Sequence, residues 1–285
     1  MSAAFLARLP ALRRLVWRAS RSLYRSARGE VRNTLASNGE TYVQACVTGA
    51  GKGRELTVFD VGANRGEWTR LLIEQAAACG VKPADLRVVM FEPVPATYEK
   101  LCGRVAQMKS PARLEICQLA LSDAAGSAEM LVLGETSGAN TLHFDDQLAA
   151  GAIGRVEVDT TTLDAFCKQR AIDHIHLLKC DAEGHDARVL SGARALLKAG
   201  QIDVAQFEYH QRWVNARSYL KDVFDLVDGL PYRVARVCPG YVEVFEQWHF
   251  ELERYFEANY LIVREPALAW FDARPGSFDI SNTYA

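Results

Sequence analysis

The amino-acid sequence predicts an α/β fold, with helices on both faces of an open, mostly parallel sheet. From Leu56 onward, short apolar runs rich in β-branched residues alternate with longer stretches of helical periodicity, as in strands joined by helical crossovers. The 285 residues are 49% hydrophobic and carry a net charge of −2. This composition allows one large or two small domains, and it excludes a disordered tail, a collagen-like repeat and a uniformly basic nucleic-acid coat.

Residues 1–28 differ from the rest of the chain in charge. They hold seven arginines and no acid, with apolar side chains between the arginines at roughly helical spacing. We expect residues 1–45 to form a basic amphipathic helical arm and residues 46–285 to form the main domain. Such a helix suits peripheral contact with an anionic membrane through residues 1–28. A transit peptide, or a helix packed on its own domain with a solvated arginine face, are the alternatives.

The order of the elements follows from the apolar pattern. The strands of the sheet are expected at residues 56–61, 86–92, 114–120, 174–180 and 202–208, and helices at 66–79, 95–108 and 186–199. Residues 127–161 interrupt this alternation with two strand-like runs, 128–133 and 156–161, which predict an inserted flap. After Pro231, the runs 232–237, 241–245 and 259–263 predict antiparallel pairing at the end of the sheet.

The loop after the first strand is the expected ligand site. Asp60 ends an apolar run, and Gly62 and Gly66 follow four residues apart before a helix. In open α/β sheets nucleotide-like ligands bind at this edge, but the pyrophosphate fingerprint has three glycines and no carboxylate ahead of them. The acid would repel a pyrophosphate and could pair with a ligand ammonium. The pattern therefore favours the methionine end of S-adenosylmethionine over NAD.

The next two strand ends extend this prediction. Glu92, followed by Pro93, ends the second strand, where an acid can accept hydrogen bonds from both ribose hydroxyls. Its alternative role is to cap the following helix. Ser122 and Asp123 end the third apolar run and are expected at an adenine edge, or else in a simple Asx turn.

Six segments resemble the FkbM-type methyltransferases. They are VFDVGANRG, FEPVPATYEKL, ALSD, VDTTTLDAF, LLKCDAEGHDARVLSGA and FEYH, in order over residues 55–265. The resemblance implies a class I, Rossmann-like methyltransferase fold that uses S-adenosylmethionine, with O-methylation of a sugar hydroxyl or of a polyketide-type product. It carries over Asp60, Gly62, Asn64, Gly66 and Glu92 as cofactor residues. Ala63, Pro93, Ser122, Asp123 and Asp181 join them as candidates from the same loop and strand ends. His185 stands where the family commonly has an acid.

The fourth and fifth strand ends carry the candidate catalytic residues. Lys179, Asp181, Glu183 and His185 alternate after the fourth strand, and Glu208 and His210 end the fifth. If the chain stays extended, the alternating side chains point to one side.

We expect Asp181 beside the transferable methyl, His210 or Glu208 as base, and Lys179 holding an acceptor oxygen or pairing with Glu208. There are three alternatives. The carboxylates could hold Mg²⁺, Lys179 and Glu183 could form an ion pair that braces the turn, or His210 could be a surface residue. His174 and His176 belong to the opposite end of the strand and are read as structural.

The predicted function is O-methylation, dependent on S-adenosylmethionine, of a saccharide or glycoconjugate hydroxyl. One alternative is a methyltransferase with a polyketide or peptide acceptor. The alternatives of other classes are a non-catalytic module that binds the cofactor or a partner, and a dehydrogenase. The loop 137–143 and the rings of Trp68, Trp213 and Trp248 are weaker candidates for acceptor contacts. Seven scattered cysteines without a C-x-x-C pair favour a reducing, cytoplasmic location. No nucleic-acid partner is expected, and the oligomeric state and any metal requirement are left open.

Overall fold

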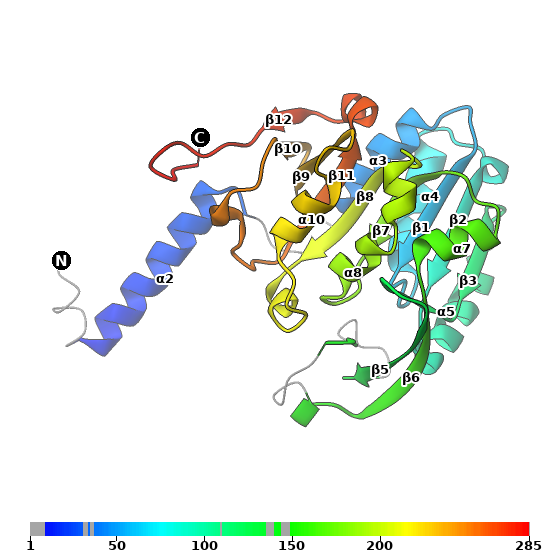
Figure 1. Cartoon of the computed structure of the whole chain (residues 1–285), viewed down its shortest axis with the longest axis horizontal. Coiled ribbons are helices and arrows are strands. Elements are labelled where there is room, and N and C mark those ends of the chain that lie inside the picture. The colour runs from blue at the N-terminus through cyan, green and yellow to red at the C-terminus, as the bar shows by residue number, and fades with distance from the viewer. Residues whose placement is uncertain are drawn as a thin grey trace.

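The large sheet dominates the architecture (Figure 1). The computed structural model describes residues 9–30, 34, 37–108, 110–134, 140–143 and 149–284. Within these ranges nine strands form one sheet in the order β12-β10-β9-β11-β8-β7-β1-β2-β3, and three form a small sheet in the order β4-β6-β5. Helices pack on both faces of the large sheet. The predicted α/β fold is confirmed.

Five neighbouring strands make up the parallel half of the large sheet. They are β1 (Leu56–Val61), β2 (Leu86–Phe91), β3 (Arg113–Cys117), β7 (Ile175–Cys180) and β8 (Ile202–Tyr209). The register places Asp60 beside Lys179 and Lys179 beside Gln206. Four of the five strands agree with the sequence prediction to within one residue. Because all five run parallel, their carboxyl ends meet at one edge.

The predicted third strand, 114–120, is divided between two sheets. β3 ends at Cys117, while β4 (Ala120–Leu121) pairs with β6 (Gly154–Thr161), which in turn pairs with β5 (Gly126–Val132). The reason is a change of hydrogen-bond partner. The carbonyl oxygen of Cys117 accepts from the amide of Glu92 at 3.1 Å, whereas the amide of Ser122 donates to Thr161 at 2.9 Å. The strand-like runs of the inserted segment fall in β5 and β6.

The C-terminal strands reverse the direction of the sheet, as predicted. They are β9 (Tyr232–Cys238), β10 (Tyr241–Phe245), β11 (Ala258–Arg264) and β12 (Ala273–Pro275). β11 lies between β8 and β9 and is antiparallel to both, and β10 is antiparallel to β9. β12, which the sequence pattern did not predict, pairs in parallel with β10.

Two apolar cores lie on opposite faces of the sheet, because side chains alternate along each strand: Val58 belongs to one core and Phe59 to the other. One face is covered by α3 (Glu40–Ala50), α4 (Glu67–Ala78) and α5 (Pro95–Gln107), and the other by α7 (Leu163–Gln169), α8 (Asp186–Ser191), α9 (Arg194–Lys198) and α10 (Leu220–Val227). Short 3₁₀ turns are η1 (Pro83–Asp85), η2 (Gln211–Val214), η3 (Phe250–Leu252) and η4 (Glu265–Trp270).

The predicted helix 186–199 is two helices, α8 and α9, which meet at Gly192. A Cβ at that position would lie 2.1 Å from the carbonyl oxygen of Ser122. The glycine therefore allows the helix pair to contact the backbone that follows β4.

Residues 10–27 of the predicted arm form a single helix, α2, which projects from the body (Figure 1). α2 (Pro10–Ala27) has no buried residue, and Leu15 and Trp17 are 64% and 68% exposed. Its last turn is attached through the Tyr24 hydroxyl, which donates to Glu251 at 3.2 Å. The boundary at residue 45 stays a prediction, and α3 runs across it. None of the helices in the described ranges has the length and apolarity needed to cross a bilayer.

Candidate active site

Two adjoining cavities lie at the carboxyl edge of the parallel strands. The first, of about 650 Å³, extends from the loop after β1 towards the small sheet, and the second, of about 720 Å³, extends towards α3 and α4. Gly62, Asn64 and Asp181 line both, so the two cavities adjoin at these residues. β1 leads into a helix on one face and β7 into a helix on the other, and such a switch point is where open α/β sheets bind ligands.

The loop after β1 needs glycine at position 62. Gly62 has φ 75°, and a Cβ there would lie 2.0 Å from the carbonyl oxygen of Asp181. The amides of Gly62 and Ala63 both donate to the carbonyl of Phe91 at 3.0 Å. These contacts hold the loop against the ends of β2 and β7, where it forms part of both cavity walls.

Glu92 bonds two backbone amides at the edge of the first cavity, but it does not cap α5, whose N-terminus has no side-chain cap bond. Its carboxylate accepts from the amide of Asn64 at 3.0 Å and from the amide of Val94, the residue before α5, at 3.1 Å. Each oxygen keeps a further lone pair, and the residue lines the first cavity. Burial raises the pKa of this carboxyl to about 7, against the opposing effect of the two amides.

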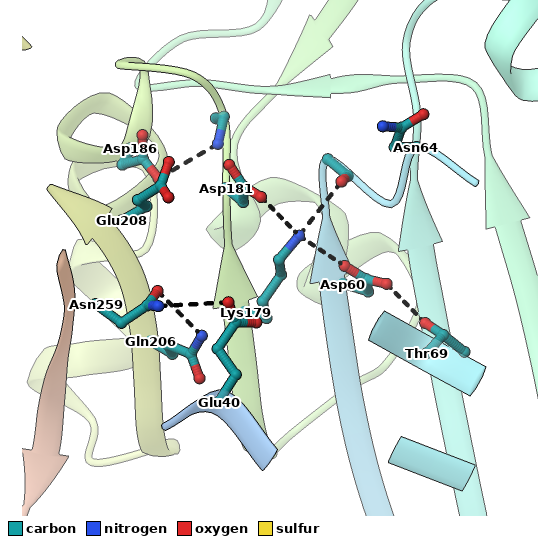
Figure 2. Close-up of polar contacts among 12 residues, drawn as sticks. Glu40, Asp60, Asn64, Thr69, Lys179, Asp181, Asp186, Gln206, Glu208 and Asn259 are labelled. Atoms are coloured by element: carbon teal, nitrogen blue, oxygen red, sulfur yellow. Dashed lines mark hydrogen bonds and ion pairs between the residues drawn. The ribbon is translucent and has the colours of Figure 1, made fainter. Parts of the chain in front are cut away.

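Asp60 lies beneath the cavities rather than in their walls. It is fully buried; Thr69 donates to Oδ2 at 2.6 Å and the ammonium of Lys179 lies 3.3 Å from Oδ1 (Figure 2). It is not among the residues that line either cavity in the described part of the chain. The direct contact with a ligand ammonium that the sequence pattern predicted does not fit this geometry, because both oxygens already face internal partners.

Lys179 joins Asp60 to the cavity. Its Nζ lies 3.4 Å from Oδ2 of Asp181 and donates to the carbonyl of Gly62 at 3.3 Å. The expected partners Glu208 and Glu183 are replaced by the two aspartates. Burial alone would lower the pKa of Lys179, but the carboxylates of Asp181, Asp60 and Glu40 raise it above its usual value. The lysine is therefore a permanent cation in this cluster.

The chain does not stay extended after β7, so the predicted one-sided alternation is wrong beyond Asp181. Glu183 has φ 53°, and Asp186 accepts from the amides of Ala182 and Gly184, which closes a turn. As a result Glu183 pairs with Arg212, while His185 turns towards the small sheet.

The ends of β7 and β8 do bring three candidate groups together. The ligand-type atoms of Glu183, Glu208 and His210 lie within 4.8 Å of one another, and Nε2 of His210 is 3.5 Å from Oε2 of Glu208. His210 is only 4% exposed, which excludes the surface-residue alternative. Burial lowers its pKa to about 4, and burial together with Asp181 raises the pKa of Glu183 to about 8. Burial also raises the pKa of Glu208, and nearby acids add to this. The imidazole is neutral at pH 7.

Ser122 and Asp123 are held by the protein instead of facing the first cavity. Ser122 lies 2.9 Å from Nε2 of His185 and donates to Asp123 at 3.0 Å, and Arg188 donates to the same aspartate at 2.7 Å. His185 in turn bonds His143 at 2.7 Å. The neighbouring residues of the third run line the cavity in their place: Leu119, Ala120 and Leu121.

The other predicted site residues divide between the cavity walls and the interior. The first cavity is lined by Gly62, Asn64, Glu92, Pro93, Asp181, Glu183 and His185, and the second by Gly62, Ala63, Asn64, Lys179, Asp181 and Glu208. Among the described residues, Asp60, Gly66, Ser122, Asp123 and His210 line neither.

The weaker candidates are mostly structural. Trp213 is fully buried and donates to the carbonyl of Glu208, and Trp248 donates to Glu253. His174 bonds Asp203, and His176 accepts from the amide of Thr57, as expected for structural histidines. Of the loop 137–143, residues 137–139 lie outside the described ranges.

The sequence pattern did not predict the contacts of Glu40, Thr69 and Arg212. Thr69 binds Asp60, Arg212 binds Glu183, and Glu40 begins α3 and lines the second cavity. Glu40 lies in the segment that the pattern assigned to the arm. The only sequence signal for Glu40 was an acidic residue in the first turn of a helix, and this signal is weak.

The fold is a class I, Rossmann-like methyltransferase fold. Its site has three features of nucleotide binding: a cavity at the switch point of the sheet, the glycine loop after β1, and the buried acid Glu92 at the end of β2. Residues 60–234 match the model of the methyltransferase FkbM domain. The chain belongs to this family of methyltransferases, which use S-adenosylmethionine, as the resemblance implied. No curated protein matches it.

Solved structures resemble the chain only distantly. An rRNA methylase from Streptococcus thermophilus is 10% identical with a TM-score of 0.40, over 78% of this chain and 94% of that one. The bifunctional kinase-methyltransferase WbdD is 11% identical with a TM-score of 0.42, over 79% of this chain and 39% of that one. A COG1565 superfamily member from Burkholderia thailandensis bound to S-adenosylhomocysteine is 13% identical with a TM-score of 0.28, over 81% and 59%.

Proposed function

We propose that the protein is an O-methyltransferase that acts on a hydroxyl of a saccharide or glycoconjugate. The observation that carries the proposal is the neutral, buried imidazole of His210, which lies 3.5 Å from Glu208, a residue of the second cavity wall. Nε2 of His210 has no hydrogen-bond partner among the described residues. An imidazole that is unprotonated at pH 7 can accept the proton of an acceptor hydroxyl.

The residues of the first cavity fit the adenosine part of the donor. Glu92 offers lone pairs to the two ribose hydroxyls, and the apolar side chains of Phe91, Leu121 and Leu142 offer a surface for the adenine ring. When bound, S-adenosylmethionine supplies an electrophilic methyl group. Asp181, at the junction of the two cavities, lies beside the expected position of that group and can orient an acceptor hydroxyl.

The acidic residues around the two cavities favour an acceptor substrate that is rich in hydroxyl groups. Asp181, Glu183 and Glu208 border the cavities, and carboxyl groups form hydrogen bonds with hydroxyls in either protonation state. A polyketide or peptide acceptor is the alternative outcome of the same assay, and a binding module without turnover is the outcome if no acceptor is modified.

The test is methyl transfer from labelled S-adenosylmethionine to panels of glycans, polyketides and peptides, read by mass spectrometry. We expect a gain of one methyl group on a glycan hydroxyl, and a loss of about 10²-fold or more in kcat for His210→Gln with cofactor affinity retained. Transfer to an amine alone, or binding of S-adenosylhomocysteine without any transfer, would contradict the proposal. A parallel assay with EDTA or Mg²⁺ tests the metal hypothesis that the cluster of Glu183, Glu208 and His210 leaves open.

Cofactor affinity should depend on the ionisation of Glu92. Hydroxyl donors favour the carboxylate, so binding lowers the raised pKa of Glu92 from about 7 and releases a proton. We expect the affinity for S-adenosylhomocysteine to rise with pH through about 7 and then level off. Calorimetry at several pH values measures this. Asp186 and Glu183, with pKa values of about 7 and about 8, titrate nearby, so Glu92→Gln is the control. A pH slope unchanged in that variant would count against the ribose assignment.

We also propose that α2 binds an anionic membrane surface, which would place the enzyme at the cytoplasmic face of a membrane. Leu15, Trp17 and Leu23 are 64%, 68% and 71% exposed on a helix with arginines along its length. Such a helix binds lipid through its apolar face and through attraction to anionic headgroups.

The membrane prediction can be checked without deleting the arm, whose buried Arg28 anchors it: the Arg28 carbonyl accepts from Arg236. A triple variant should no longer sediment with phosphatidylglycerol vesicles, while its melting temperature should be unchanged. Its substitutions are Arg13→Glu, Arg14→Glu and Arg18→Glu. Wild-type protein should not sediment with neutral phosphatidylcholine vesicles. Equal sedimentation of variant and wild type with anionic vesicles would refute the idea.

A further inference from the structure

We propose that the amino-acid end of S-adenosylmethionine binds in the second cavity, with Glu40 receiving its α-ammonium and Trp68 its α-carboxylate. The inference rests on the proposed function in that it takes the donor to be bound with its adenosine part in the first cavity. It replaces Asp60, which the sequence pattern favoured for the ammonium.

The two cavities match the two ends of the donor. They adjoin at Gly62, Asn64 and Asp181, and the first holds the residues suited to adenosine. A ligand that begins beside Glu92 and passes Asp181 therefore enters the second cavity with its other end. For S-adenosylmethionine this end is an α-amino acid, which carries an ammonium and a carboxylate.

Three polar atoms around the second cavity have no hydrogen-bond partner in the described part of the protein. They are Oε2 of Glu40, Oδ1 of Asn64 and Nε1 of Trp68. Glu40 and Trp68 are only 8% and 4% exposed, so water does not freely replace the missing partners. Two acceptors and one donor are the complement of an ammonium together with a carboxylate.

Glu40 is oriented by its own network (Figure 2). Its Oε1 accepts from the side-chain amides of Asn38 and Asn259, at 2.5 Å and 3.3 Å, which leaves Oε2 as the atom without a donor. Asn259 is in turn bonded by Gln206 at 3.3 Å. A carboxylate held in this way by one oxygen presents the other in a fixed position.

Trp68 occupies the first turn of α4, a helix of 12 residues. Its backbone carbonyl accepts from Gln44 of α3, which fixes the first turn of α4 against α3. The backbone amides of a first helical turn also favour an anion, which adds to the single donor of the indole. The carboxylate is therefore expected on the α4 side of the cavity and the ammonium on the α3 side.

Asp60 suits the ammonium less well than Glu40: its Oδ1 also accepts no hydrogen bond among the described residues, but the side chain is not part of either cavity wall. Thr69 and Lys179 face its two oxygens, and the side chain is fully buried. Its role is to hold Lys179, which donates to the carbonyl of Gly62 and so steadies the loop between the cavities.

The experiment compares ligands with and without the amino-acid end. Binding of S-adenosylhomocysteine and of 5′-methylthioadenosine, which lacks that end, is measured by calorimetry for wild type, Glu40→Gln and Trp68→Phe. We expect Glu40→Gln to weaken S-adenosylhomocysteine by about tenfold to a hundredfold and Trp68→Phe by about threefold to tenfold, since bonds to charged groups are the strong ones. Affinity for 5′-methylthioadenosine should change by less than about twofold in both.

The matched control is Glu67→Gln. This substitution also removes a negative charge from the lining of the second cavity. The side chain of Glu67 is 58% exposed and pairs with Arg104, so affinity for S-adenosylhomocysteine should remain within about twofold of wild type. Equal losses for both ligands in Glu40→Gln would mean that Glu40 acts through the fold, and no loss for S-adenosylhomocysteine would also overturn the proposal.

A ligand-side measurement covers the case in which Glu40→Gln fails to fold. The deaminated analogue of S-adenosylhomocysteine should bind wild type as weakly as Glu40→Gln binds the parent compound. Wild-type binding of this analogue as tight as that of the parent overturns the ammonium site. Failure of wild type to bind S-adenosylhomocysteine at all would instead overturn the proposed function, so the two failures are distinguishable.

Discussion

Gly62→Ala should lower the stability of the protein by about 2–5 kcal/mol and weaken cofactor binding by more than tenfold. Position 62 has φ 75°, where an alanine costs about 1–2 kcal/mol. Its Cβ would also lie 2.0 Å from the carbonyl oxygen of Asp181, and overpacking against backbone costs about 1–3 kcal/mol. The loop after β1 and the turn after β7 must then separate, which disturbs the walls of both cavities.

Thermal unfolding and calorimetry with S-adenosylhomocysteine measure the two effects. For a domain of this size the melting temperature should fall by about 3–8 °C. Gly103→Ala is the control, because Gly103 lies inside α5 with no atom near its Cβ position, and alanine there should be neutral or stabilising by up to about 1 kcal/mol. Wild-type melting and affinity in Gly62→Ala would show that the close approach does not hold the loop.

The strands could be predicted because their signal is local. Residues 56–61 and 174–180 are apolar runs that a doubly wound sheet buries on both faces, and their ends were found to within one residue. The division of the third strand could not be predicted. It depends on Ser122 bonding Thr161 across the inserted segment, and this contact leaves no mark on the apolar pattern. The break at Gly192 depends on the same region, since it packs on Ser122.

The sequence predicted where the residues of the candidate site lie better than it predicted which groups they contact. Strand-end residues such as Asp181, Glu92 and Glu208 do lie together because the edge of a parallel sheet gathers them. Their partners are set by contacts distant in sequence: Thr69 occupies Asp60, and Arg212 draws Glu183 away from the alternation once φ becomes positive. An acid at a strand end can be recognised from sequence, but whether it faces a ligand or a buried lysine cannot.

Lys179→Met should be the most destabilising single substitution in the cluster. It keeps the length of the side chain but leaves the carboxylate of Asp60, which is fully buried, with Thr69 as its remaining contact among the described residues. Removing one partner of a buried ion pair costs about 3–5 kcal/mol, because the other charge stays buried. The bond from Nζ to the carbonyl of Gly62 is also lost, so cofactor affinity should fall as well.

The sign of the pH effect follows from the raised pKa of Lys179. A base whose pKa is higher in the folded state stabilises that state fully below its unfolded value of about 10.4 and loses the contribution as pH rises beyond it. The difference in unfolding free energy between wild type and Lys179→Met should therefore persist across pH 6 to 9. Lys198→Met removes an exposed lysine from α9 and should stay within about 0.5 kcal/mol of wild type.

The double variant Lys179→Met/Asp60→Asn separates the charge from the packing. If the unpaired carboxylate causes the loss, then neutralising it should recover more than half of the lost stability, because the two substitutions act on one interaction and are not additive. The amide oxygen that Asp60→Asn introduces can still accept the Thr69 hydroxyl, so the remaining contact survives. Chemical denaturation of wild type, Lys179→Met, Asp60→Asn and the double variant measures the coupling free energy between the two residues. A double variant less stable than Lys179→Met would show instead that Asp60 is held by Thr69 and its surroundings, with Lys179 serving mainly the loop above it.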